Sequence, residues 1–145
     1  MSTRIKITMF GLMIAGLGGG LIACGQDGRK LDAERIAAAA GAKATTTDDG
    51  VVRIAWPRND VPLKVDGMPL KPVAGLGSWA AFTKAPHGAM AMGDTVVFED
   101  EVTPARDAAF ASGLEVTGLH NHFLFDEPKV YFMHVGGTGE PEKLA

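Results

Sequence analysis

The chain has 145 residues, a formal net charge of −3 and 46% hydrophobic residues, which suits one globular domain and is too short for two domains of the usual size. Its pI of about 5.7 argues against a nucleic-acid-binding protein, because such proteins normally present a basic face. A single cysteine excludes an internal disulfide and any zinc or iron–sulfur site built from several cysteines.

Residues 1–23 have the layout of a bacterial secretory signal. Arg4 and Lys6 form a positive start, and an apolar stretch of about 17 residues follows, at the low edge of what spans a bilayer. The stretch ends in Leu21-Ile22-Ala23-Cys24, which resembles the lipobox of bacterial lipoproteins. The resemblance implies cleavage before Cys24 and acylation of its sulfur. The alternative is a signal anchor in which the cysteine is incidental.

Cleavage would leave a mature chain of residues 24–145, of which 24–30 form a polar tether. The signal holds two of the 14 Lys and Arg residues and none of the 17 Asp and Glu residues, so the mature chain has 12 basic and 17 acidic residues and a net charge of −5. That sign disfavours docking onto anionic lipid headgroups, so the lipid on Cys24 is the expected membrane contact. We therefore expect a lipid-anchored protein of the bacterial cell envelope, with its domain outside the cytoplasm.

The first half of the domain, residues 31–145, begins with a helix and continues in short strands. Asp32 fits the N-cap of a helix over 33–40, and Gly41 fits its C-terminal stop. Asp66-Gly67 marks a tight hairpin turn. Alternating apolar runs predict strands over 51–56, 61–65, 78–83, 89–92 and 95–99, with a turn at Gly93-Asp94 between the last two.

The second half predicts one helix and a hairpin. Thr103 fits the cap, Pro104 the first position and Gly113 the stop of a helix over 104–112. Runs over 114–125 and 129–135 then predict a β-hairpin across residues 126–128. The expected fold is a single α+β domain, with a mainly antiparallel sheet and two short helices packed on it. Five large side chains are expected in its core: Trp56, Trp79, Phe82, Met90 and Met92.

Three of the four histidines, His120, His122 and His134, fall on the predicted hairpin. Alternate residues of a strand share a face, and a three-residue turn would set position 120 opposite 134. Three imidazoles on one face are a credible ligand set for a divalent transition metal such as zinc, with Glu101 or Glu99 as the carboxylate partner. The alternative is that hydrogen bonds to backbone carbonyls and Glu101 hold the histidines, with no metal.

Six segments together resemble the LppY/LpqO family of bacterial lipoproteins, a domain of unknown function. They are PRND (57–60), VDGMPLKP (65–72), LGSWAAF (76–82), AMAMGDTVVFEDEV (89–102), GLEVTGLHNH (113–122) and VYFMHVGGTG (130–139). The resemblance covers residues 31–145, and its most specific parts are the Leu-His-Asn-His and Phe-Met-His motifs. Members often carry two copies and this chain has one, which implies self-association into a homodimer. The resemblance implies no activity, substrate or catalytic residue.

Three functions therefore compete. The leading hypothesis is a non-catalytic envelope module that binds a metal ion or small polar ligand through His120, His122, His134 and Glu101. The competing hypothesis is a metal-dependent hydrolase, in which a glutamate is the general base for a metal-activated water that attacks an envelope substrate. The third is a partner-binding domain whose histidines only hold the hairpin together. The fourth histidine, His87, is expected in a solvated loop.

Overall fold

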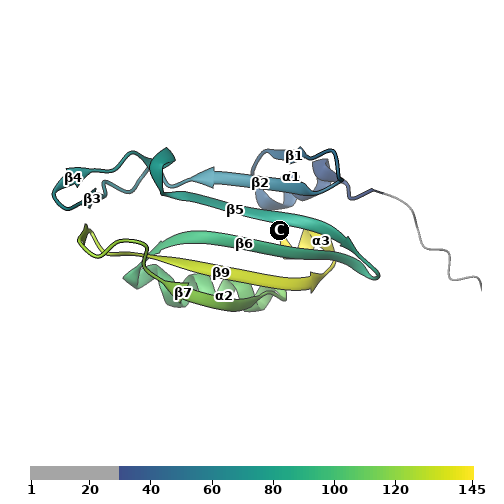
Figure 1. The fold of residues 1–145 in the computed structure, drawn as a ribbon. Helices are drawn as coiled ribbons and strands as arrows, with labels where there is room; N and C mark the ends of the chain where they lie inside the picture. The colour runs from purple at the N-terminus through teal and green to yellow at the C-terminus, as the bar shows by residue number, and fades with distance from the viewer. Residues whose placement is uncertain (1–29) are drawn as a thin grey trace, which may run out of the picture.

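The computed structural model describes residues 30–145, so the predicted signal and Cys24 lie outside the described residues. The described chain is a single α+β domain built on a six-stranded antiparallel sheet, as predicted (Figure 1). In spatial order its strands are β1 (Ala44–Thr46), β2 (Val52–Pro57), β5 (Gly77–Ala85), β6 (Gly88–Phe98), β9 (Val130–Gly139) and β7 (Glu115–His120). Within residues 30–145 no helix is both long enough and apolar enough to cross a membrane.

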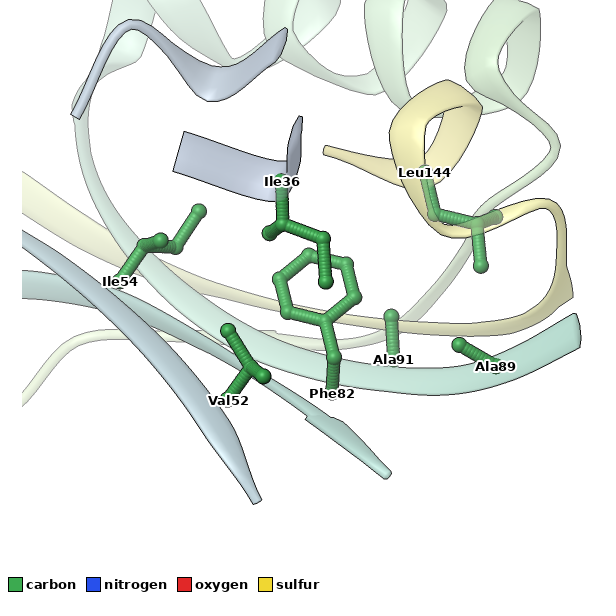
Figure 2. Packing of buried hydrophobic residues seen from close by; sticks show 7 residues of the cluster. All are labelled: Ile36, Val52, Ile54, Phe82, Ala89, Ala91 and Leu144. Carbon is green, nitrogen blue, oxygen red and sulfur yellow. The ribbon is translucent and has the colours of Figure 1, made fainter. Parts of the chain in front are cut away.

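Three helices cover one face of this sheet, which we call the helix face: α1 (Ala33–Ala40), α2 (Val102–Ser112) and α3 (Pro141–Leu144) (Figure 1). The main core lies between α1, α3 and the sheet, where Ile36 and Leu144 pack over Phe82 (Figure 2). The helix over 33–40 is confirmed, because the Asp32 carboxylate accepts hydrogen bonds from two amides of its first turn and Gly41 ends it at φ 61°.

The opposite face, which we call the open face, is covered at one end by residues 58–76. This covering segment includes β3 (Lys64–Val65), β4 (Met68–Pro69) and the 3₁₀ turn η1 (Pro72–Ala74), and β3 also pairs with the short strand β8 (Asp126–Glu127). The predicted turn between β3 and β4 is confirmed, since Asp66 and Gly67 take positive φ values of 52° and 76°. A second core forms beneath the segment, from Val61, Leu63, Leu76, Val96, Val130 and Phe132.

The predicted turn at Gly93-Asp94 is wrong, because β6 runs unbroken through both residues. Gly93 serves a different purpose in the middle of the strand. A Cβ at this position would lie 2.9 Å from the Trp79 carbonyl oxygen and 3.2 Å from the Val135 side chain. The glycine therefore allows close packing on the helix face, and the strand continues to place Asp94 on the open face.

Two further boundaries differ from the predictions. Helix α2 starts at Val102 rather than at Pro104, with Glu101 at its N-cap in place of the predicted Thr103, and the predicted stop at Gly113 is confirmed. The β7–β9 hairpin forms, but its connection runs from residue 121 to 129 because β8 leaves the larger sheet to pair with β3. The longer connection shifts the register, so that His120 lies opposite Phe132 and Gly118 lies opposite His134.

The predicted core is right for Phe82 and wrong for three other side chains. Phe82 is fully buried, whereas Trp56, Met90 and Met92 are 39%, 45% and 48% exposed. Both methionines lie on the open face, beyond the covering segment, where none of the described helices packs. The half-buried Trp79 is on the same face, beneath the guanidinium of Arg53 at 4.7 Å.

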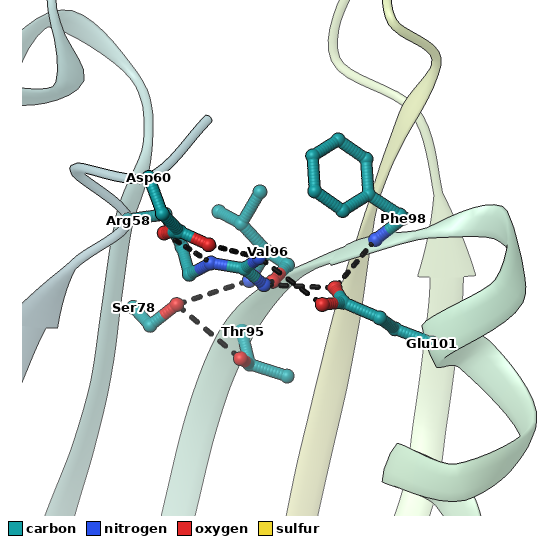
Figure 3. Close-up of polar contacts among 7 residues, drawn as sticks. All are labelled: Arg58, Asp60, Ser78, Thr95, Val96, Phe98 and Glu101. Carbon is teal, nitrogen blue, oxygen red and sulfur yellow. Dashed lines mark hydrogen bonds and ion pairs between the residues drawn. The ribbon is translucent and has the colours of Figure 1, made fainter. Parts of the chain in front are cut away.

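Arg58 connects the covering segment to the sheet through hydrogen bonds (Figure 3). Its guanidinium donates to the Val96 carbonyl at 2.9 Å and to both carboxylate oxygens of Glu101, at 2.8 and 3.1 Å. Asp60 accepts two more hydrogen bonds from the same group, and Glu101 also accepts from the Phe98 amide. This network joins residues 43 positions apart, because Glu101 belongs to the 3₁₀ turn η2 (Glu99–Glu101) after β6.

We predict that Glu101→Gln lowers the free energy of unfolding at pH 7 by about 1 kcal/mol, since it removes the charge from a partly exposed, bidentate ion pair. The hydrogen bond from Arg58 holds the pKa of the Glu101 carboxyl below its ordinary value of 4.5. The extra stability of the wild type over Glu101→Gln is therefore fully present at pH values above this ordinary pKa. It is lost as the pH falls through the lower pKa of Glu101 in the folded state. Urea unfolding at a series of pH values measures it.

The matched control is Glu99→Gln, an exposed carboxylate in the same turn, for which we expect a change within about 0.5 kcal/mol. An equal loss in both variants at pH 7 would contradict the role of the Arg58 pair.

Candidate functional site

The strands bring polar side chains together near the middle of the open face. Asp94 on β6 lies opposite His134 on β9, which lies opposite Gly118 on β7. Directly opposed residues of antiparallel strands point to the same face, so the three positions form one row across the sheet. His120 occupies the next row, opposite Phe132.

A β-bulge in β7 puts His120 on the open face. Glu115 and Val116 pair in order with Gly136 and Val135, and then the register shifts, so that Gly118 rather than Thr117 opposes His134. If β7 continued after Val116 as a regular strand without the bulge, His120 would share the face of Val116, the helix face, because side chains alternate. The bulge therefore turns His120 toward His134.

His120 and His134 meet through their outer nitrogens. The two Nε2 atoms lie 2.7 Å apart, and the rings are nearly parallel, with centroids 4.9 Å apart. Gly118 leaves room for this contact, since a Cβ there would lie 3.3 Å from the His134 ring, closer than side chains usually pack. Both side chains are accessible to solvent, and 38% of the His134 side chain is exposed.

His122 joins the cluster but faces a different partner. Its ring stacks on Phe132 with centroids 3.4 Å apart, and lies 5.0 Å from the His120 ring. Loss of hydration, together with the nearby His120, lowers the pKa of His122 below its ordinary value. The three predicted histidines are thus gathered on one face, with His120 and His134 as the pair whose nitrogens converge.

Asp94 lies behind His134 and was not among the predicted site residues. Its Oδ1 is buried and accepts no hydrogen bond from any described residue, and His134 Nδ1 is 3.7 Å away. A carboxylate at Nδ1 favours the tautomer with its proton on that nitrogen, which leaves the Nε2 lone pair free to bind a ligand. The sequence signal was the unbroken alternation of small and large residues from Ala89 to Asp94, typical of one continuous strand rather than a turn.

The structure does not bring the predicted carboxylates to the histidines. Glu101 is held by Arg58, as described above, and Glu99 is exposed in η2. Among residues 30–145 no group of three or more His, Cys, Asp and Glu side chains is arranged to hold a metal ion. His87 is exposed in the turn between β5 and β6, in agreement with the prediction for it.

The pair can still offer two imidazole nitrogens to one ion. Nitrogens bound at about 2.0–2.1 Å to a tetrahedral ion lie about 3.3 Å apart, so the observed 2.7 Å would widen by about 0.6 Å. The same contact can also be a hydrogen bond in which one ring donates and the other accepts. The geometry therefore permits a two-imidazole metal site or a structural histidine pair.

A cavity of about 210 Å³ lies elsewhere, between the sheet and helices α2 and α3. Its lining is mainly apolar and includes Phe82, Ala109, Met133 and Leu144. None of the three clustered histidines lines it, but Asp94 does, so the cavity borders the polar site at this one residue of the cluster.

Comparison with known proteins adds a family and no activity. The family described as "Domain of Unknown Function (DUF1259)" matches residues 34–145, which include all of the histidine cluster. Neither the curated proteins nor the solved structures contain a match to the chain.

We predict that Gly118→Val separates His120 from His134, because its side chain would occupy the space beneath the His134 ring. The measurement is the imidazole ¹⁵N chemical shifts of the two histidines in the folded variant. Gly77→Val is the control, since a Cβ at Gly77 meets nothing within 4 Å and β-branched residues suit a strand. Unchanged imidazole shifts in folded Gly118→Val would show that the glycine does not set the contact.

Proposed function

The chain belongs to the family described as "Domain of Unknown Function (DUF1259)", and we propose that its domain is a non-catalytic module that binds a transition-metal ion through His120 and His134. The observation that carries the proposal is the convergence of the two Nε2 atoms, 2.7 Å apart on a solvent-accessible face. Imidazole nitrogen is a common protein ligand for zinc, copper, nickel and iron. Water or a donor from a bound molecule would complete the coordination.

Asp94 supports a ligand role for His134 in this proposal. Metal-binding histidines commonly donate their other ring N–H to a carboxylate, which fixes the tautomer and raises the basicity of the ligand nitrogen. Asp94 Oδ1, buried and 3.7 Å from His134 Nδ1, stands where such a partner is needed.

Binding is favoured over hydrolysis because neither Glu101 nor Asp94 lies where a general base would have to be. A metal-dependent hydrolase needs a general base beside the activated water. Glu101 is paired with Arg58, and Asp94 lies behind His134 with 12% of its side chain exposed. Neither carboxylate is placed to take a proton from water on the open side of the histidine pair.

We further propose that the module is a lipoprotein of the LppY/LpqO family, anchored at the bacterial envelope. The lipobox-like Leu21-Ile22-Ala23-Cys24 supports the anchor, and the segments 113–122 and 130–139 support the family name. Acyl chains contribute about 0.8 kcal/mol per buried methylene, so a diacylated cysteine would hold the domain on a membrane without further contacts.

The metal proposal is tested by calorimetric titration of the full-length chain with Zn²⁺. We expect binding of one ion, loss of that binding in His120→Ala and His134→Ala, and a reduction of about 10–100-fold in affinity in Asp94→Asn. His87→Ala is the control and should bind as the wild type does. No binding by the folded wild type, or equal binding by all the histidine variants, would overturn the proposal.

Intact mass measurement of the chain from a bacterial host tests the anchor. The wild type should lack residues 1–23 and carry acyl groups on Cys24, whereas Cys24→Ala should retain residues 1–23 without acyl mass, because the thiol is what the acylation modifies. Wild-type protein with an unmodified Cys24 would contradict the lipoprotein assignment.

A further inference from the structure

The main core is filled beneath α1 and α3 and hollow beneath α2. Ile36 of α1 is fully buried over Phe82, and Leu144 of α3 is 6% exposed (Figure 2). Helix α2 has only one buried residue, the small Ala109. The cavity of about 210 Å³ lies beside it, with Phe82 and Leu144 in its wall. The cavity is therefore an extension of the main core that none of residues 30–145 fills.

The lining of the cavity suits an apolar occupant that carries no charge. Among the described residues no Lys, Arg or His lines it, and its one charged residue is the acidic Asp94. A cavity of roughly 150 Å³ with an apolar lining stays dry and holds a benzene molecule. At that ratio a cavity of 210 Å³ takes about eight carbon atoms. An esterified acyl chain meets these conditions, whereas a free fatty acid would bring a carboxylate toward Asp94.

The cavity opens to solvent between the end of β2 and helix α2. Trp56 on β2 is 39% exposed and Ala108 on α2 is exposed, although both residues line the cavity. We call this opening the mouth. An acyl chain can enter through it without unfolding of the sheet.

The described chain begins within reach of the mouth. Leu31 packs against the main core, and together with Lys30 it lines a surface depression that also includes Val51, at the start of β2. Trp56 is five residues further along this strand, a distance of about 17 Å. Cys24 is six residues before Lys30, and a chain of that length spans up to about 20 Å. An acyl chain on Cys24 can therefore reach the mouth.

We propose that the cavity holds one acyl chain of a diacylated Cys24 while the protein is off the membrane. This inference rests on the lipid anchor proposed above and is independent of the histidine site. A lipid taken from the bilayer has the same kind of tail, but the chain on Cys24 is tethered and so has the higher effective concentration.

Such shelter would make the anchor easier to reverse. Two acyl chains hold a protein stably on a membrane, whereas a single chain gives only marginal, reversible attachment. Burial of about eight carbon atoms in the cavity removes part of one chain from water when the protein leaves the bilayer. The released protein is stabilised, and transfer from one membrane to another becomes faster.

Met133 provides a direct readout of occupancy, because it lines the cavity and is 1% exposed. The full chain is produced in a bacterial host, its acylation is checked by mass, and its methionine methyl groups are labelled with ¹³C. Spectra in lipid-free buffer are compared before and after a lipase hydrolyses the ester-linked acyl groups. We expect the Met133 signal to move and the signal of Met68, a methionine that is 69% exposed and outside the cavity, to stay in place.

Transfer between vesicles tests the consequence. Ala109→Leu and Ala105→Leu each place a larger side chain in the cavity wall, so one variant reports if the other does not fold. The acylated variants should move from donor to acceptor vesicles of phosphatidylcholine at least about tenfold more slowly than the wild type. Ala111→Leu is the control, since it makes the same change at an exposed position of α2 outside the cavity, and it should transfer as the wild type does.

The outcomes separate this inference from the lipid anchor. An unmodified Cys24 would overturn both. An acylated chain whose Met133 signal does not respond to the lipase, or cavity variants that transfer as Ala111→Leu does, would overturn the inference and leave the anchor in place. A Met133 signal that responds only when dihexanoyl phosphatidylcholine is added to the deacylated chain would assign the cavity to a lipid tail taken from the membrane, against the proposal.

Discussion

The antiparallel pairing of β6 with β9 is the constraint on which both faces of the sheet depend. Ten consecutive residue pairs, from Ala89–Gly139 to Phe98–Val130, fix one register. Side chains alternate with a period of two, so a slip of one residue would turn either Asp94 or His134, depending on which strand moved, into the helix-packed core and would expose apolar residues of that strand. Gly93 strengthens the constraint, because its missing side chain lets β5 and β9 pack closely on either side. The core and the histidine site are therefore set by the same pairing.

Strand β7 adds the second histidine to this frame through one irregularity. A bulge costs a strand some ladder hydrogen bonds, and it is tolerated more easily at a sheet edge, where β7 lies. Here the bulge at Thr117 changes which face the later residues of β7 occupy, and Gly118 then leaves space for the His134 ring. The position of His120 thus depends on a backbone feature and a glycine rather than on a contact made by its own side chain.

The features that could be predicted from the sequence are those decided by neighbours along the chain. The Asp32 cap, the Gly41 and Gly113 stops and the Asp66-Gly67 turn all depend on residues within a few positions. The rest depends on distant partners. Gly93 resembles a turn residue in the sequence, and only its neighbours β5 and β9 show that it lies within a strand. Glu101 looks unpaired in the sequence, because its partner Arg58 is 43 positions away. The register of the histidines shifted because β8 pairs with β3, which no local pattern predicts. His120 and His134 still share a face because position 118 rather than 120 opposes His134, a difference of two residues, and an even difference keeps the same face. His122 lies beyond the end of β7, so alternation along the strand does not place it.

Affinity and selectivity have separate origins in the proposed site. A buried carboxylate without a partner costs about 1–3 kcal/mol, and Asp94 Oδ1 is such a group among the described residues. A cation bound at Nε2 of His134 makes Nδ1–H a stronger hydrogen-bond donor toward Asp94. The hydrogen bond would relieve the cost of the unpartnered carboxylate, and the affinity for every metal would rise alike, by about tenfold for each 1.4 kcal/mol relieved. It cannot distinguish one metal from another, since it acts through the imidazole. Discrimination has to come from a further ligand for which two metals differ in preference, because the two imidazoles are good ligands for several of them.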